Sequence, residues 1–163
     1  MLPEGFEYHN GNGTLCLIGS YDYVKEEFTE ECNQAVDYGI DFYAPQTFED
    51  NQGRRILIAW MYNWSRQAVA GQTHVGAFTI PRQMDINIKD ELILFPVEEA
   101  CGLLKKESPF VSYERGMLRI VYEGKTVLEK PYAEEPSVQI LEDVGVIEIF
   151  VNGGKENITT YIC

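Results

Sequence analysis

The sequence predicts an all-β fold. Its apolar runs are short and rich in Ile, Val, Leu and aromatic residues, turn-forming residues separate them, and only one segment has helical spacing. The 163 residues are 45% hydrophobic and 12% aromatic, which is typical of a folded chain and not of a disordered one. Short strands with regular turns are typical of a β-sandwich or of a β-propeller blade.

The first part of the chain contains five predicted strands. Residues Asn10–Gly13 are a turn signal before the first strand, and Glu49–Gly53 has the composition of a hairpin loop. Pro45 lies within the second apolar run and indicates a bulge, an edge or a strand end. The predicted strands are Leu15–Tyr23, Ile40–Phe48, Arg55–Tyr62, Gly76–Ile80 and Glu91–Val97.

A short connecting helix is predicted over Val97–Lys106, because Val97, Cys101 and Leu104 recur at helical spacing between two prolines. Strands are predicted again after this helix. The run Val146–Val151 is expected to be buried along most of its length, with Glu148 as its one outward-facing residue. The other predicted strands are Phe110–Tyr113, Met117–Glu123, Thr126–Pro131, Val138–Leu141 and Ile158–Ile162.

A change of composition near Asn87–Glu91 predicts a boundary between two parts, residues 1–88 and residues 89–163. The sequence before it is aromatic and rich in turns, and the sequence after it is more aliphatic. No low-complexity linker separates the two parts, so we expect them to pack on each other.

The negative charge of the chain disfavours polyanionic partners. Its formal net charge of −13 disfavours nucleic acids and anionic membranes, whereas neutral sugars are compatible with it. No apolar run approaches the roughly 20 residues of a membrane span, and no signal-peptide pattern is visible. The four cysteines have no CxxC spacing, so we expect no metal site. Because no secretory signal is visible, we expect reduced thiols in a cytoplasmic protein, and we expect no cofactor.

Four motifs carry a resemblance to a known family. Asp37–Phe48 reads DYGIDFYAPQTF and continues into Gly53–Met61, which reads GRRILIAWM. Together they resemble a block of glycoside hydrolase family 32. The segments Phe78–Met84, Leu94–Glu99 and Ile147–Gly154 resemble three further motifs of this family in the same order.

The resemblance implies a five-bladed β-propeller followed by a β-sandwich. This chain would hold the last blade and a reduced sandwich, because the region between Pro96 and Glu148 is shorter than is usual in the family. The family includes invertase, sucrose-6-phosphate hydrolase, levanase and inulinase. The implied function is therefore that of the C-terminal portion of a hydrolase acting on β-fructosides, with the substrate open among sucrose, sucrose 6-phosphate and fructans.

Members of this family act through three carboxylates. An Asp nucleophile lies in a WMNDPN-type motif, a second Asp in an RDP motif, and a Glu general acid in an EC motif. The 163 residues contain neither WMNDPN nor RDP. Glu31 and Cys32 spell EC, but Glu31 precedes Asp41 by only ten positions, where the family has a whole blade. We expect Glu31 to be a solvated hairpin carboxylate and the chain to be inactive alone.

Three residues are candidates for sugar binding. Asp41 and Tyr43 lie on what resembles the innermost strand of the blade. Asp41 would hydrogen-bond a sugar hydroxyl or a catalytic neighbour or, alternatively, backbone at a strand bend, and Tyr43 would flank the sugar ring. Trp60 could offer a flat apolar face to a sugar or pack in the core, and Trp64 is expected in the core. His74 is expected to be structural or solvated.

The expected partners follow from the same resemblance. A β-fructoside would bind if the pocket is completed. A lone blade exposes apolar faces and strand edges, so we expect self-association or an N-terminal propeller partner. A non-catalytic carbohydrate-binding or structural module and an enzyme completed in trans remain alternatives. Arg54 and Arg55 are expected to pair with neighbouring acids.

Overall fold

The computed structural model describes residues 13–64 and 75–162. These residues form strands and one short 3-10 helix, so the prediction of an all-β fold is confirmed. The elements are β1 (Leu15–Asp22), β2 (Glu27–Ala35), β3 (Tyr43–Glu49), β4 (Arg55–Met61), β5 (Ala77–Phe78), β6 (Arg82–Ile86), β7 (Leu92–Pro96), η1 (Glu98–Leu103), β8 (Val111–Glu114), β9 (Met117–Tyr122), β10 (Lys125–Pro131), β11 (Val138–Asp143), β12 (Val146–Val151) and β13 (Glu156–Tyr161).

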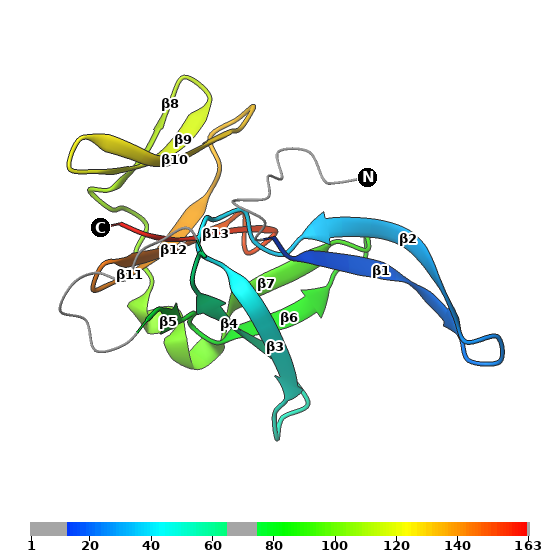
Figure 1. Cartoon of the computed structure of the whole chain (residues 1–163). Coiled ribbons are helices and arrows are strands. Elements are labelled where there is room, and N and C mark those ends of the chain that lie inside the picture. The colour runs from blue at the N-terminus through cyan, green and yellow to red at the C-terminus, as the bar shows by residue number, and fades with distance from the viewer. Residues whose placement is uncertain (1–12, 65–74, 163) are drawn as a thin grey trace.

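The strands form four antiparallel sheets (Figure 1). The largest has the order β3-β4-β6-β7, with β5 paired to β4. Two three-stranded sheets follow along the chain, β10-β9-β8 and β11-β12-β13. Strands β1 and β2 form a separate hairpin that projects from the body of the molecule (Figure 1).

Two strands, β2 and β6, were not predicted. Both are rich in polar side chains, with sequences EFTEECNQA and RQMDI. Strand β2 pairs with β1 from Asp22↔Glu27 to Leu15↔Ala35, and β6 pairs with β7 along its whole length. Polar segments of this kind lack a clear hydrophobic pattern, so their sequences do not predict a strand. Both segments are strands because each pairs with a neighbouring strand.

The predicted helix is shorter than expected. Only Glu98–Leu103 is helical, as a 3-10 helix without a side-chain cap at Val97. The chain becomes extended again at Leu104, and Lys105 forms an isolated bridge with Ile140 of β11. No helix among residues 13–64 and 75–162 is long and apolar enough to span a membrane.

The apolar side chains form two core clusters. The larger fills the space between β8–β9–β10 and β11–β12–β13 and includes Ile120, Ile147 and Ile149, each fully buried. The smaller packs Val36 and Phe42 against the sheet of β4 and β7. Strand β12 contributes Ile147, Ile149 and Val151 to the larger cluster, and all six of its residues are buried.

The expectation that Glu148 faces outward is wrong. Its side chain is 2% exposed, on the face of β12 opposite the larger cluster. Alternation along β12 does place Glu148 apart from Ile147 and Ile149, but its face packs against the sheet of β6 and β7 rather than water.

The predicted boundary at residues 87–91 falls on the turn between β6 and β7. Asn87 and Glu91 close this turn through a backbone hydrogen bond of 3.0 Å. Strands β6 and β7 belong to one sheet, so this sheet crosses the predicted boundary. The division into residues 1–88 and 89–163 stays a prediction.

Candidate functional site

Arg82 is the centre of a buried charge network that joins β6 to β12, β13 and the segment after β2. Its Nη1 donates to Oδ2 of Asp37 at 2.9 Å, and its Nη2 donates to Oε2 of Glu148 at 2.7 Å and to Oγ1 of Thr159 at 2.6 Å. The Arg82, Asp37 and Glu148 side chains are at most 2% exposed. We call these four residues the buried charge network.

Asp37 connects this network to backbone. Its Oδ1 accepts hydrogen bonds from the N–H groups of Gly39 at 2.7 Å and Thr159 at 2.9 Å. A Cβ at Gly39 would lie 1.9 Å from the carbonyl oxygen of Thr159, so only glycine permits this close approach of the Gly39 backbone to β13. The segment that starts at Asp37 is therefore held tightly against β13.

Burial raises the pKa of Glu148 above its ordinary value, although Arg82 acts in the opposite direction. Two carboxylates share one guanidinium, so the nearby charge of Asp37 adds to the effect of burial on the pKa of Glu148. The protonated form of Glu148 is therefore favoured relative to an exposed carboxyl group.

A pH dependence of stability follows. Because the pKa of Glu148 is higher in the folded state than in the unfolded state, its contribution to the free energy of unfolding is fully present below its ordinary pKa of 4.5. This contribution is lost as the pH rises through the pKa of Glu148 in the folded state. We expect the difference in free energy of unfolding between wild type and Glu148→Gln, measured by urea titration, to be most favourable to wild type at low pH. The exposed Glu135→Gln change serves as control. If the wild type instead gained stability relative to Glu148→Gln as the pH rises, the raised pKa of Glu148 would be contradicted.

Asp41 lies beside this network and is 0% exposed. Its Oδ2 accepts hydrogen bonds from Thr160 Oγ1 and from the N–H of Tyr161, both at 3.0 Å. Its own N–H donates to the carbonyl oxygen of Thr159 at 3.1 Å. These are bonds of the kind expected for a structural role, and direct sugar binding by Asp41 stays a prediction.

The structure places Tyr43 and Trp60 side by side, and their proposed contact with a sugar stays a prediction. They are register partners on β3 and β4, with ring centroids 6.3 Å apart. Two further rings join them: Tyr62 stacks on Trp60 at 4.2 Å, and Trp64 meets Tyr62 edge-on at 5.1 Å and Tyr43 at 5.9 Å. We call Tyr43, Trp60, Tyr62 and Trp64 the aromatic cluster.

The aromatic cluster is partly open to solvent. Trp64 is 61% exposed, so the expectation that it packs in the core is wrong. Phe78, the partner of Trp60 on β5, is 77% exposed. Met61 and Asn63 alternate with the cluster residues and are buried, which leaves the rings on the outer side of the chain.

Two contacts fix the cluster to its surroundings. The Nε1 of Trp60 donates to the carbonyl oxygen of Val75 at 3.2 Å. The amide of Asn63 donates to the carbonyl oxygen of Ile40 at 3.0 Å, which connects the cluster to the segment between Asp37 and Tyr43. Preorganised aromatic faces of this kind are suited to the apolar C–H face of a sugar ring.

Sequence reasoning missed the buried charge network and two of the four cluster rings. The spacing of Trp60, Tyr62 and Trp64 at every second position was a usable signal, because such residues share one side of an extended chain. No local signal connects Arg82 with Asp37 and Glu148, which are 45 and 66 positions away.

The remaining candidates are not part of this site. Glu31 is exposed on β2 and accepts a hydrogen bond from Ser20 at 3.0 Å, as expected for a solvated hairpin carboxylate. Arg54 pairs with Asp50 and Glu99, which confirms its expected pairing with neighbouring acids. His74 lies outside the described residues.

The family model described as "Glycosyl hydrolases family 32 N-terminal domain" matches residues 1–96. Sucrose-6-phosphate hydrolase of Bacillus subtilis is 33% identical over 145 residues, which cover 86% of this chain and 28% of that protein. Sucrose-6-phosphate hydrolase of Zymomonas mobilis is 43% identical over 101 residues, covering 61% of this chain and 19% of that protein.

Among solved structures, the β-fructofuranosidase of Bombyx mori resembles this chain with a TM-score of 0.77 and 20% identity. The match covers 98% of this chain and 44% of that structure, and at this identity it shows the fold alone. The chain spans less than a third of the two sucrose-6-phosphate hydrolases. The match over residues 1–96, more than half of the chain, shows that it belongs to glycosyl hydrolase family 32.

Proposed function

We propose that this chain is the C-terminal portion of a hydrolase acting on β-fructosides, with the last propeller blade in residues 1–88 and a reduced β-sandwich in residues 89–163. The proposal is supported by the family match and by relatives named sucrose-6-phosphate hydrolase. The substrate is proposed as a class: sucrose, sucrose 6-phosphate or a fructan.

The observation that carries this proposal is the partly exposed aromatic cluster on the segment with the strongest family motif. In the proposal, Tyr43 and Trp60 contact the sugar. Asp41 supports them, because its bonds to Thr160 and Tyr161 hold the backbone that leads into Tyr43.

The catalytic step is proposed to require residues outside this sequence. Retaining glycosidases place nucleophile and acid roughly 5–5.5 Å apart on either side of the scissile bond. The nucleophile and second-Asp motifs are absent from the 163 residues. Glu31 lies on β2, in the hairpin that projects from the body of the molecule (Figure 1), whereas the aromatic cluster is carried by β3, β4 and the residues after β4. The chain alone is therefore proposed to bind but not to cleave.

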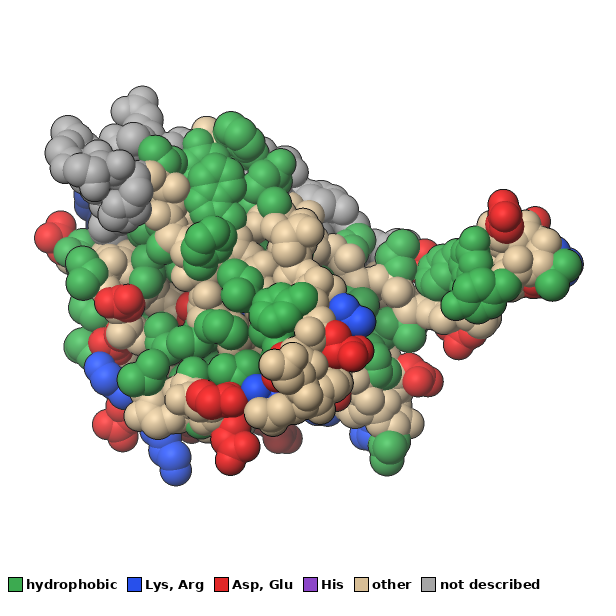
Figure 2. Space-filling model, turned by 90° about the horizontal axis from the view of Figure 1, so that it is seen from below, with side chains coloured by type: hydrophobic (Ala, Val, Ile, Leu, Met, Phe, Trp, Pro, Cys, Tyr) green, Lys and Arg blue, Asp and Glu red, His purple; other side chains and the backbone are tan. Residues whose placement is uncertain are grey.

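The partner surface is proposed to be the β1–β2 hairpin. Among the described residues, β1 and β2 pair only with each other, so each leaves an open strand edge. Figure 2 shows hydrophobic side chains gathered on this projecting arm. The exposed apolar residues are Leu17, Tyr21, Tyr23, Val24 and Phe28. A second copy or an N-terminal propeller piece would cover them.

Tryptophan fluorescence tests sugar binding directly, since Trp60 and Trp64 are the only two tryptophans in the sequence. We expect sucrose and short fructo-oligosaccharides to change the emission, and maltose to leave it unchanged. Trp60→Ala, read out through Trp64, is expected to weaken binding about threefold to tenfold, through loss of an aromatic face.

Tyr23→Ala is the matched control, because it removes an exposed ring on the hairpin, away from the cluster. A response to maltose equal to that to sucrose, or no response to any fructoside, would contradict the proposed site. Fructoside binding without hydrolysis even in the presence of an N-terminal piece would favour the second candidate, a non-catalytic binding module.

A further inference from the structure

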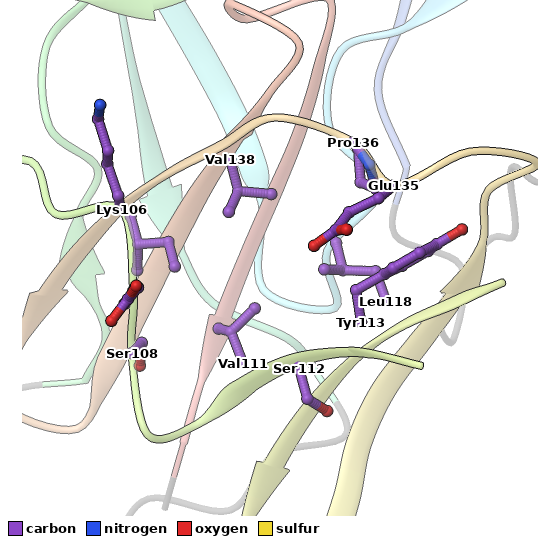
Figure 3. A pocket seen from close by; sticks show the side chains of 11 residues that line it. Lys106, Ser108, Val111, Ser112, Tyr113, Leu118, Glu135, Pro136 and Val138 are labelled. Carbon is purple, nitrogen blue, oxygen red and sulfur yellow. The ribbon is translucent and has the colours of Figure 1, made fainter. Parts of the chain in front are cut away.

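A cleft of about 340 Å³ lies between the sheet of β8 and β9 and the edge strand β11 (Figure 3). It is separate from the aromatic cluster, which is carried by β3, β4 and the residues after β4. A second hollow of about 440 Å³ adjoins it and shares Lys106, Glu135, Pro136 and Val138. The second hollow is also lined by Ser137 and Gln139, so it extends the space next to β11.

The cleft opens where the chain before β8 leaves the edge of β11. Lys105 and Ile140 exchange two backbone hydrogen bonds of 2.8 Å, and the chain then diverges. The carbonyl oxygen of Ser137, directly before β11, accepts a hydrogen bond from the N–H of Asn152, directly after β12. The alternation of an antiparallel pair therefore turns the N–H and C=O of the next residue, Val138, away from β12 and toward the cleft.

This open edge is too short for an added peptide strand. Ile140 is already paired with Lys105, and Pro136 has no N–H to donate. Val138 therefore offers one donor and one acceptor, which suits a small hydroxylated ligand better than a strand.

The side chains combine an apolar floor with one carboxylate. Leu118 and Ile140 form the buried floor. Figure 3 shows Val111 and Val138 facing each other across the space, with the Glu135 carboxylate directed into it.

The ring of Tyr113 lies beside Glu135 in Figure 3. The hydroxyl of Tyr113 already donates to the carbonyl oxygen of Tyr132 at 3.0 Å, so the cleft receives its ring rather than its hydroxyl. The Lys106 ammonium group points away from the space in Figure 3.

From this arrangement we infer that the cleft binds a residue of a neutral oligosaccharide. A sugar ring can set its C–H face against Tyr113 and Val111, donate hydroxyl protons to Glu135 and to the Val138 carbonyl, and accept from the Val138 N–H. The carboxylate of Glu135 and the net charge of −13 disfavour phosphorylated sugars here. The adjoining hollow, which shares Glu135 and Val138 with the cleft, leaves room for a second sugar residue.

Backbone amide NMR of the purified chain tests the inference. Titration with a neutral inulin-type trisaccharide, a neutral malto-oligosaccharide and sucrose 6-phosphate separates the ligand classes. We expect the amides of Val138, Glu135 and Tyr113 to shift with a neutral saccharide, with a dissociation constant on the order of 1 mM. Sucrose 6-phosphate is expected to bind more weakly at these amides.

Glu135→Ala is expected to weaken this binding about tenfold, because it removes a charged acceptor at an exposed position. Glu134→Ala, the neighbouring exposed carboxylate that does not line the cleft, and Trp60→Ala are expected to leave it unchanged. Absence of shifts with both neutral saccharides, tighter binding of sucrose 6-phosphate, or indifference to Glu135→Ala would overturn the inference. Because Trp60→Ala tests the aromatic cluster separately, failure here is distinguishable from failure of the proposed function.

Discussion

Replacement of Arg82 by alanine is expected to lower the free energy of unfolding by about 3–5 kcal/mol, because it leaves two buried carboxylates without their counter-charge. The Arg82 side chain is 0% exposed and bonds Asp37, Glu148 and Thr159 at 2.6–2.9 Å. Its guanidinium also lies over the rings of Phe42 and Phe150, at 5.4 and 5.1 Å from their centroids. Urea or thermal unfolding followed by circular dichroism measures the loss.

Two further variants separate the charge effect from loss of packing. Arg55→Ala removes a guanidinium that is 49% exposed and 3.9 Å from Glu49, so little change is expected. The triple variant Arg82→Met, Asp37→Asn, Glu148→Gln removes all three charges together and is expected to recover most of the stability lost in Arg82→Ala. A loss in Arg82→Ala no larger than that in Arg55→Ala would show that the network does not hold the sheets together.

Removal of the apolar side chains from the β1–β2 hairpin is expected to convert a self-associating chain into a monomer. Tyr21 and Phe28 are register partners and are 47% and 46% exposed. The double variant Tyr21→Lys, Phe28→Glu places opposite charges directly across the hairpin, so it keeps a cross-strand pair while making the surface polar. Sedimentation velocity over a range of concentrations measures the mass.

The matched control is Ile88→Lys with Val144→Glu. These residues are 101% and 95% exposed on other turns, so the same charges are added away from the hairpin. We expect this control to sediment like wild type, at about twice the monomer mass or more. A wild-type chain that is monomeric at every concentration would refute the hairpin as an association surface, and so would a double variant that still associates.

The strands predicted best from sequence are those whose own residues strongly favour a buried strand. The predicted strand Val146–Val151 agrees with β12 residue for residue, and Arg55–Tyr62 agrees with β4 to within one residue. Both are dominated by β-branched and aromatic side chains. Strand β2 was missed because its residues are mostly polar and it exists through pairing with β1.

The candidate site was predictable only in part, for a related reason. Tyr43 and Trp60 were selected by motif, and their contact follows from the pairing of β3 with β4. Glu148 was misjudged because alternation reveals which side chains share a face but not whether that face meets water or another sheet. Its burial depends on Arg82, which reaches it from a different sheet.

The chain is proposed to carry part of a β-fructoside site without the catalytic carboxylates. Release of glucose and fructose from sucrose by the purified chain tests it most directly. We expect no release above a protein-free control, for wild type and for Glu31→Gln alike. A sustained rate that is lost in Glu31→Gln would make Glu31 a catalytic residue, and the chain would then contain a catalytic carboxylate after all.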